Sequence, residues 1–180
     1  MSRIIGGAAG GRRIVMPKTT ATRPTSDRVR EGLFSSLGGD LTGRGFLDLY
    51  AGSGAVGLEA ASRGADPVVL VERDARAVAA ARDNVASLGL TQVQVRAESV
   101  ARFLAEPAVT RFDVVFVDPP YADPVERVIE QVVAGGWLAA EGVVVVERAS
   151  RDDEPTWPEG VVTDRSRRYG DSTLWYGRRP

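Results

Sequence analysis

The chain has 180 residues, of which 43% are hydrophobic and 26% charged, and its formal net charge is −1. This length and composition suit one folded domain, and the absence of cysteine and histidine excludes disulfide frameworks, thiolate zinc sites and imidazole catalysis. No stretch approaches the roughly 20 apolar residues of a membrane span, so we expect a cytoplasmic protein.

The first predicted element is a glycine-rich hairpin with basic character. Short β-prone runs at residues 3–5 and 13–15 flank four glycines, which is typical of two strands joined by a turn. Residues 1–30 hold seven basic residues against the single acidic Asp27. We therefore expect residues 1–24 to form a phosphate-binding extension of a main domain at 25–180, with a solvated basic surface as the alternative.

Next comes a helix at residues 27–37, capped by Ser26 and ended by Gly38 and Gly39, and after it strands and helices alternate. The predicted strands are 45–50, 67–72, 92–96, 112–117 and 142–147, and the predicted helices are 55–63, 75–88, 99–104 and 124–134. Such alternation indicates an α/β fold with a parallel sheet. Segments 161–166 and 172–176, joined through Tyr169-Gly170-Asp171, should form an antiparallel hairpin at the edge of that sheet.

Residues 46–57 run from a strand through a glycine turn into a helix, the order that nucleotide-binding sheets use. Gly52 and Gly54 can take backbone angles closed to other residues, and Gly57 permits close packing of the helix on the strand. A tight turn without a ligand is the structural alternative. The residues assigned to a cofactor here are Asp48, Tyr50, Gly52, Ser53, Gly54 and Gly57.

The glycine spacing matches a dinucleotide site as well as a site for S-adenosylmethionine. Glu72 lies about 20 residues after Gly52, where a carboxylate accepts hydrogen bonds from the ribose of either cofactor. Asp48 favours S-adenosylmethionine, because a carboxylate at the mouth of the loop repels a pyrophosphate and attracts amino and sulfonium groups. The remaining candidates are Arg73 beside Glu72, and Glu98 with Ser99 at the adenine edge, where a simple helix cap is the alternative.

The predicted strand 112–117 runs into the tetrapeptide Asp118-Pro119-Pro120-Tyr121 at the same edge of the sheet. An exocyclic base amine is a poor nucleophile because its lone pair is delocalised into the ring. The Asp118 carboxylate and the Pro119 carbonyl can each accept one N–H and free that lone pair, and Asp118 can take the proton. Tyr121 offers a face on which an extruded base stacks.

These three residues, Asp118, Pro119 and Tyr121, are the predicted catalytic group, and the reaction needs no metal because a sulfonium is already an activated leaving group. A strand stop followed by a helix cap is the alternative for the prolines and Asp118. For Tyr121 the alternative is a residue of the core.

Two further stretches are RPTSDRVREGLF at residues 23–34 and LDLYAGSG at 47–54. Together with the Asp-Pro-Pro-Tyr motif they resemble the bacterial methyltransferases that modify guanine N2 in 16S ribosomal RNA, the guanine 966 type. The segment Arg168-Tyr169-Gly170-Asp171 is similar to the C-terminal part of that family.

The resemblance implies a class I, Rossmann-like methyltransferase fold: a doubly wound, seven-stranded, mostly parallel sheet with a C-terminal antiparallel hairpin and a small N-terminal β-hairpin. It implies S-adenosylmethionine as cofactor, S-adenosylhomocysteine as product, and 16S rRNA in the small ribosomal subunit or an assembly intermediate as partner. We expect a monomer. RNA binding is then assigned to Arg3, Arg12, Arg13, Lys18, Arg23, Arg28 and Arg168.

Other functions stay open from the residues alone. Adenine N6 methylation of DNA uses the same tetrapeptide, although 180 residues leave no room for a separate target-recognition domain. Methylation of a protein glutamine is another candidate, and enzymes of that kind more often carry Asn where Asp118 stands. A nicotinamide-dependent oxidoreductase accounts for the glycine spacing and Glu72 only, and a non-catalytic RNA-binding module leaves the tetrapeptide without a purpose.

Overall fold

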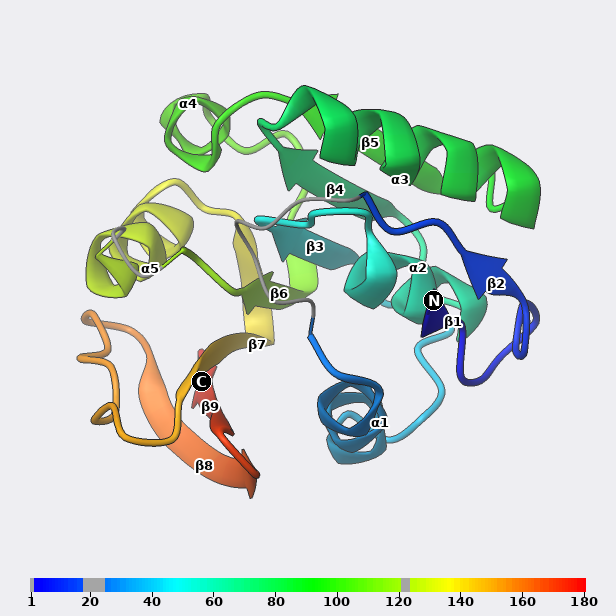
Figure 1. Ribbon diagram of the computed structural model, residues 1–180. Coiled ribbons are helices and arrows are strands. Elements are labelled where there is room, and N and C mark those ends of the chain that lie inside the picture. Colours follow the sequence, from blue (N-terminus) through cyan, green and yellow to red (C-terminus); the bar gives the residue numbers. More distant parts are fainter. Residues whose placement is uncertain (1, 18–24, 121–123) are drawn as a thin grey trace.

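The computed structural model describes residues 2–17, 25–120 and 124–180, and its centre is a seven-stranded sheet (Figure 1). The strands of this sheet are β3 (Phe46–Leu49), β4 (Val68–Glu72), β5 (Val93–Ala97), β6 (Phe112–Val117), β7 (Leu138–Ala149), β8 (Val162–Tyr169) and β9 (Ser172–Arg178). Their spatial order is β5-β4-β3-β6-β7-β9-β8. The predicted doubly wound α/β fold is confirmed.

Strands β3 to β7 are parallel, and the chain changes direction across the sheet next to β3. Strands β4 and β5 lie on one side of β3, and β6 and β7 lie on the other. In such sheets ligands bind outside the carboxyl ends of the strands at this switch point. Strand β9 pairs antiparallel with both β7 and β8, so the C-terminal hairpin closes the edge of the sheet as predicted.

Two layers of helices cover the sheet, because its central strands are apolar on both faces. The helices are α1 (Asp27–Ser36), α2 (Ala55–Ser62), α3 (Ala75–Leu88), α4 (Val100–Ala105) and α5 (Val125–Ala134). Helices α1, α2 and α3 pack on one face, and α4 and α5 pack on the other. The predicted Ser26 cap is present, since Ser26 accepts a hydrogen bond from the Val29 N–H, and Asp74 caps α3 by accepting one from the Ala77 N–H.

Most elements begin and end within two residues of the predicted positions, and strand β7 is the main exception. It begins at Leu138 rather than at residue 142, because the register against β6 shifts between Phe112 and Val114 and lets a longer segment pair. Glu141 in this stretch has a φ of 59°, so the strand is irregular there. An irregular strand lacks the regular alternation from which a strand is predicted. Strand β8 likewise continues to Tyr169.

The N-terminal hairpin, β1 (Ser2–Arg3) with β2 (Arg13–Ile14), is packed into the main body of the protein. Its residues Ile4, Ala9 and Ile14 are buried in the same apolar cluster as α1 and α2. Figure 1 shows the hairpin beside α2. The sequence does not reveal this burial, because three scattered apolar residues between glycines give no sign that a neighbouring helix covers them.

A buried carboxylate, that of Glu59 in α2, anchors the hairpin. It accepts hydrogen bonds from the Ile5 N–H at 2.7 Å and the Gly6 N–H at 2.9 Å, and it pairs with Arg63 at 2.8 Å. The fully buried Arg30 of α1 lies 3.9 Å from the same carboxylate. Charges this deeply buried persist only when they are paired and hydrogen-bonded.

Arg30 also ties the hairpin to α1. Its Nη2 donates to the Ser2 hydroxyl at 2.9 Å and to the Arg3 carbonyl at 2.8 Å, while pairing with Asp27 at 2.6 Å. Helices α1 and α2 and the first strand therefore meet around one charged cluster.

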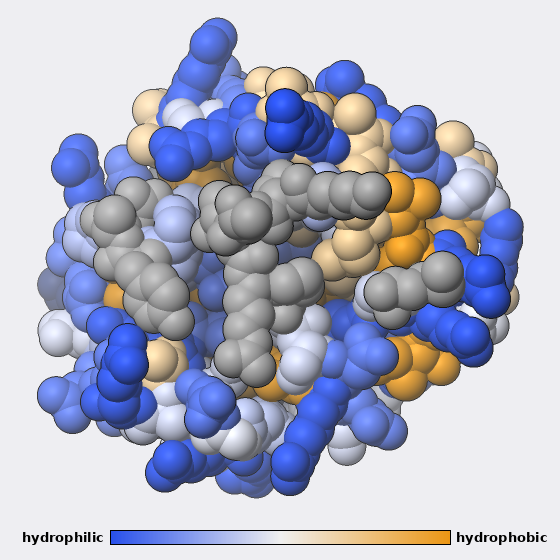
Figure 2. Space-filling view, viewed as in Figure 1, coloured by the Kyte–Doolittle hydropathy of each residue, from blue (hydrophilic) through white to orange (hydrophobic). Residues whose placement is uncertain are grey.

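Charged and polar side chains dominate much of the outer surface seen in Figure 2, with smaller apolar areas between them. No helix within the described residues is long and apolar enough to cross a bilayer.

We predict that Glu59→Ala lowers the free energy of unfolding by about 3–5 kcal/mol, because the change removes the buried carboxylate that pairs with Arg63 and leaves the fully buried Arg30 with only the largely exposed Asp27 as its ion-pair partner among the described residues. It also removes the acceptor of two hairpin N–H groups, so limited proteolysis should release the first residues. The control is Glu130→Ala, at an exposed position of α5. Equal urea midpoints for the two variants would contradict the anchoring role.

Candidate functional site

The glycine loop joins the carboxyl end of β3 to the start of α2, at the switch point of the sheet. Tyr50, Gly52 and Gly54 all have positive φ angles, of 65°, 57° and 86°. Such an angle is strained for a tyrosine and is maintained only when the surrounding structure enforces it. A side chain at Gly52 would meet nothing within 4 Å, so the loop faces open space. There is room for a ligand directly against its backbone.

Gly57 performs the packing role that the sequence predicted. A Cβ at this position would lie 2.2 Å from the Leu70 side chain of β4 and 3.2 Å from a carboxylate oxygen of Asp48. Helix α2 therefore rests directly on the sheet. This close approach also lets the Gly57 N–H donate to the Asp48 carboxylate at 2.8 Å.

Asp48 lies under the loop rather than at its mouth, and only 2% of its surface is exposed. Burial raises the pKa of Asp48 to about 7; the Gly57 N–H opposes the rise and the nearby Glu72 adds to it. Asp48 is therefore only partly ionised near neutral pH, and its carboxyl group bonds the first turn of α2 beneath the loop.

The Glu72 carboxylate at the end of β4 holds the loop from the side. It accepts hydrogen bonds from the backbone N–H groups of Gly52, Arg73 and Asp74, each at 2.8 Å. The two positions that the sequence linked by their spacing are therefore in contact. A carboxylate offers about four acceptor sites, so capacity for a ribose hydroxyl remains. Arg73 itself is exposed.

The remaining cofactor candidates have other partners in the structure. Glu98 pairs with Arg96 at 2.6 Å and lies 3.7 Å from Arg102, and Ser99 caps α4 through the Arg102 N–H. These contacts match the helix-cap alternative for Ser99, and adenine binding by either residue stays a prediction.

Ser53 is also engaged, by a contact that the sequence did not reveal. Its hydroxyl donates to the Met16 sulfur, and its carbonyl accepts from Asn84 of α3 at 3.1 Å. Asn84 further exchanges hydrogen bonds of 2.7 and 2.9 Å with the backbone of Val15. The N-terminal segment is thereby joined to the glycine loop. The available signal was a polar residue on the apolar stripe of the helix that contains Ala81 and Leu88.

The motif Asp118-Pro119-Pro120 directly follows β6, beside the glycine loop, and all three residues are partly buried. Burial raises the pKa of Asp118 well above its usual value, and the charges of Glu147 and Asp48 raise it further, while a hydrogen bond with the Thr25 side chain lowers it. Tyr121 lies outside the described residues, so its stacking role stays a prediction.

Two residues near Asp118 were not predicted from the sequence. Glu147 lies on β7, the strand next to β6, and it accepts a hydrogen bond from the Thr25 hydroxyl at 3.0 Å. Thr25 directly precedes the Ser26 cap of α1. Glu147 could have been found as a carboxylate at the end of the predicted strand 142–147. Thr25 could have been found as a polar residue within the stretch 23–34 that resembles the family.

Four neighbouring strands therefore bring carboxylates to one edge of the sheet: Asp48, Glu72, Asp118 and Glu147. Their mutual repulsion contributes to the raised pKa values of Asp48 and Asp118. Such a field attracts the amino and sulfonium groups of S-adenosylmethionine and repels a pyrophosphate. Within the described ranges, no cluster of three or more acidic side chains has the arrangement of a metal site.

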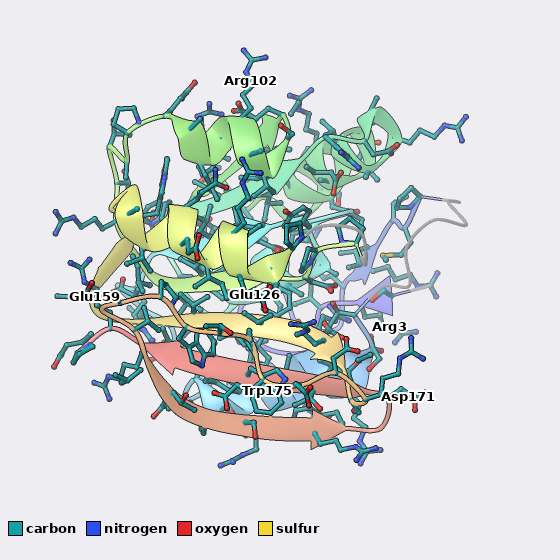
Figure 3. All side chains as sticks on the ribbon, turned by 90° about the vertical axis from the view of Figure 1, so that its left-hand side faces the viewer. Arg3, Arg102, Glu126, Glu159, Asp171 and Trp175 are labelled. Carbon is teal, nitrogen blue, oxygen red and sulfur yellow. The ribbon has the colours of Figure 1, made fainter. Side chains whose placement is uncertain are left out.

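The predicted RNA-binding residues have different surroundings. Arg12 donates to the carbonyls of Ser87 and Leu88 at the C-terminus of α3, a capping role that occupies much of its guanidinium. Arg3, Arg13, Arg28 and Arg168 are exposed, and none of these four forms an ion pair with the described residues. Arg3 lies toward the same end of the molecule as Asp171 (Figure 3). Lys18 and Arg23 lie outside the described residues.

Comparison with known proteins identifies relatives along almost the whole chain. The family described as conserved hypothetical protein 95 matches residues 2–178. Ribosomal RNA small subunit methyltransferase D of Escherichia coli strain K12 is 40% identical over 157 residues, which cover 87% of this chain and 79% of that protein. The putative rRNA methyltransferase YlbH of Bacillus subtilis is 34% identical over 172 residues, which cover 93% and 94%.

A solved structure agrees with these sequence relatives. The putative methyltransferase yhhF from Escherichia coli has a TM-score of 0.89 to this chain at 35% identity, covering 98% of this chain and 97% of that one. The glycine loop, the carboxylates around it and the order of the strands fit the same assignment. The chain therefore belongs to the conserved hypothetical protein 95 family, and it is an S-adenosylmethionine-dependent methyltransferase with the class I, Rossmann-like fold.

Proposed function

We propose that the protein transfers a methyl group from S-adenosylmethionine to the exocyclic N2 amine of a guanine in 16S ribosomal RNA, the guanine 966 type. The observation that carries this proposal is the pair of carboxylates Asp118 and Glu147 on neighbouring strands beside the glycine loop. The names of the Escherichia coli and Bacillus subtilis relatives support ribosomal RNA as the substrate. We further propose that the enzyme acts as a monomer in the cytoplasm, on the small subunit or an assembly intermediate.

The residues around the loop fit the cofactor. Open space above Gly52 leaves its backbone accessible, Glu72 can accept from the ribose, and a bound cationic group would favour the ionised forms of Asp48 and Asp118. When bound, S-adenosylmethionine supplies a methyl group that its sulfonium has already activated. The oxidoreductase alternative loses support, because a pyrophosphate at this loop would face the same carboxylates.

Asp118 has the properties of an acceptor for the amine. Its carboxylate and the Pro119 carbonyl can each hold one N–H, which orients the nitrogen and frees its lone pair. As the nitrogen gains the methyl group it must lose a proton, which the carboxylate can accept. A carboxylate with a raised pKa is a better base than an ordinary one, because its pKa lies closer to the operating pH.

Glu147 favours guanine over adenine as the target. Guanine presents an N1–H donor beside its N2 amine, whereas adenine presents an unprotonated N1 beside its N6 amine. A second carboxylate next to Asp118 complements two adjacent donors and repels an acceptor. This complementarity argues against the DNA adenine alternative.

The direct test is incubation with labelled S-adenosylmethionine and small subunits that lack the modification, followed by nucleoside analysis. We predict N2-methylguanine at one position. Asp118→Ala should lower kcat by about 10²–10⁴-fold, the usual contribution of a positioned acid or base, while RNA affinity is retained. The control is Asp83→Ala, at an exposed position of α3. No transfer by the wild type to subunits or to rRNA would refute the proposed function.

A base analogue tests the role of Glu147. 2-Aminopurine keeps the C2 amine but lacks the N1–H, so we predict about 5–160-fold slower methylation than for guanine at the target position of a synthetic rRNA fragment, corresponding to about 1–3 kcal/mol. Glu147→Ala should narrow that ratio toward one. An unchanged ratio in the variant would show that Glu147 does not contact N1.

The pH dependence tests the coupling of the two carboxylates. A protonated Asp118 cannot accept the proton, so kcat/KM should decrease as the pH falls through the pKa of Asp118. Because this pKa is raised, the decrease should occur at a higher pH than for an ordinary aspartate, whose pKa is about 4. Glu147→Gln removes the neighbouring negative charge, which lowers the pKa of Asp118 and moves the acid limb of the profile to lower pH. A limb that stays in place would contradict the coupling.

A further inference from the structure

A groove of about 600 Å³ runs along the surface between α1 and β8, on the far side of the C-terminal hairpin from α5. Helix α1 contributes Arg28, Glu31 and Gly32 to its walls, and β8 contributes Arg167, Arg168 and Tyr169. The two walls are far apart in the sequence. Arg28 and Arg168 were predicted individually, and the tertiary structure adds Arg167 and places the three arginines around one groove.

The groove is basic, and its charges are not neutralised by the protein. Three arginines face a single acidic residue, Glu31, and none of the three forms an ion pair within residues 2–17, 25–120 and 124–180. Arg167 and Arg168 each donate to one backbone carbonyl of the same hairpin, at 2.9 and 3.3 Å. Five donors per guanidinium leave most of their hydrogen-bonding capacity unused.

The two walls of the groove touch where Gly32 meets Tyr169. A Cβ at Gly32 would lie 2.2 Å from the Tyr169 ring, so the ring lies directly against the helix backbone. Nearby, Arg165 donates to the Ser36 carbonyl at 2.8 Å and fixes the other end of α1 to β8. These contacts hold the two walls at a fixed separation. The three arginines lie on helix α1 and strand β8 rather than on loops.

Both walls of the groove are connected to the surroundings of the predicted catalytic residues by short stretches of chain. Arg28 is one turn along the chain from Thr25, whose hydroxyl donates to Glu147. The turn after Tyr169 is held to the end of β7 by the hydrogen bond from the Ser150 N–H to the Asp171 carbonyl. Figure 3 shows Asp171 at the end of the molecule toward which β7 runs.

We infer that this groove binds the phosphate backbone of the RNA strand that flanks the target base, an inference that rests on the proposed function. The carboxylates at the sheet edge repel phosphates, so a strand whose base enters that site needs cations directly outside it. The groove between α1 and β8 supplies these cations as Arg28, Arg167 and Arg168. Guanidinium groups suit phosphate because they bind it in a bidentate manner.

The test compares wild type with a triple variant, Arg28→Gln, Arg167→Gln and Arg168→Gln. The matched control replaces Arg82, Arg111 and Arg178 by Gln, since these are exposed and lie on α3, before β6 and at the end of β9. Binding of each protein to the rRNA substrate is measured from 50 to 300 mM salt, and methyl transfer is measured at limiting and saturating RNA. Thermal unfolding and calorimetry with S-adenosylmethionine confirm that fold and cofactor binding are retained.

We expect the groove variant to lose about 2 from the magnitude of the slope of log affinity against log salt, since each lost contact to single-stranded RNA removes about 0.7. Its KM for RNA should rise, with kcat at saturation and cofactor affinity unchanged, and the control should match wild type in KM. A wild type that methylates RNA while the groove variant keeps the slope and KM of the control would overturn the groove and leave the proposed function intact. A wild type that transfers no methyl group to RNA would overturn both.

Discussion

The hydrogen bond between the buried Asp48 carboxylate and the Gly57 N–H is the interaction on which the site depends. It forms because Gly57 has no side chain, so the first turn of α2 can rest on β3 and β4. The loop between them follows a path with positive φ angles at Gly52 and Gly54. The energetic cost is a carboxylate held away from water, which its raised pKa reports.

Asp48 is one of several acidic groups that the fold gathers in one region, while basic groups lie in another. The edge of the sheet gathers carboxylates from four strands, which suits a cationic cofactor and an amine that must lose a proton. The basic groups lie outside this edge, in the groove between α1 and β8. An enzyme that binds both a cationic methyl donor and a polyanion needs a negative surface for the first and a positive surface for the second. Here the two surfaces lie on different elements, the carboxylates at the sheet edge and the arginines between α1 and β8.

The N-terminal segment supports the site as well as extending from it. Glu59 and Arg30 fix the hairpin to two helices, and Asn84 joins Val15 to the glycine loop. Arg12, whose RNA-binding role stays a prediction, also has a structural contact that its charge alone does not reveal. A basic residue in a glycine-rich arm resembles a phosphate ligand, yet this guanidinium reaches the carbonyls at the end of α3, which lies more than seventy residues further along the chain.

The sequence by itself determined the alternating strands and helices, the glycine loop with Glu72, and the acidic motif after β6, because each depends on local periodicity or on a short motif. Only the tertiary structure decided that Asp48 lies under the loop, that Glu147 and Thr25 join Asp118, and that Arg28, Arg167 and Arg168 share a groove. Two of these relations, Thr25 with Glu147 and Arg28 with the arginines of β8, join residues more than one hundred positions apart. They follow from the order of strands in the sheet and the helix packed beside it, which no local pattern in the chain encodes.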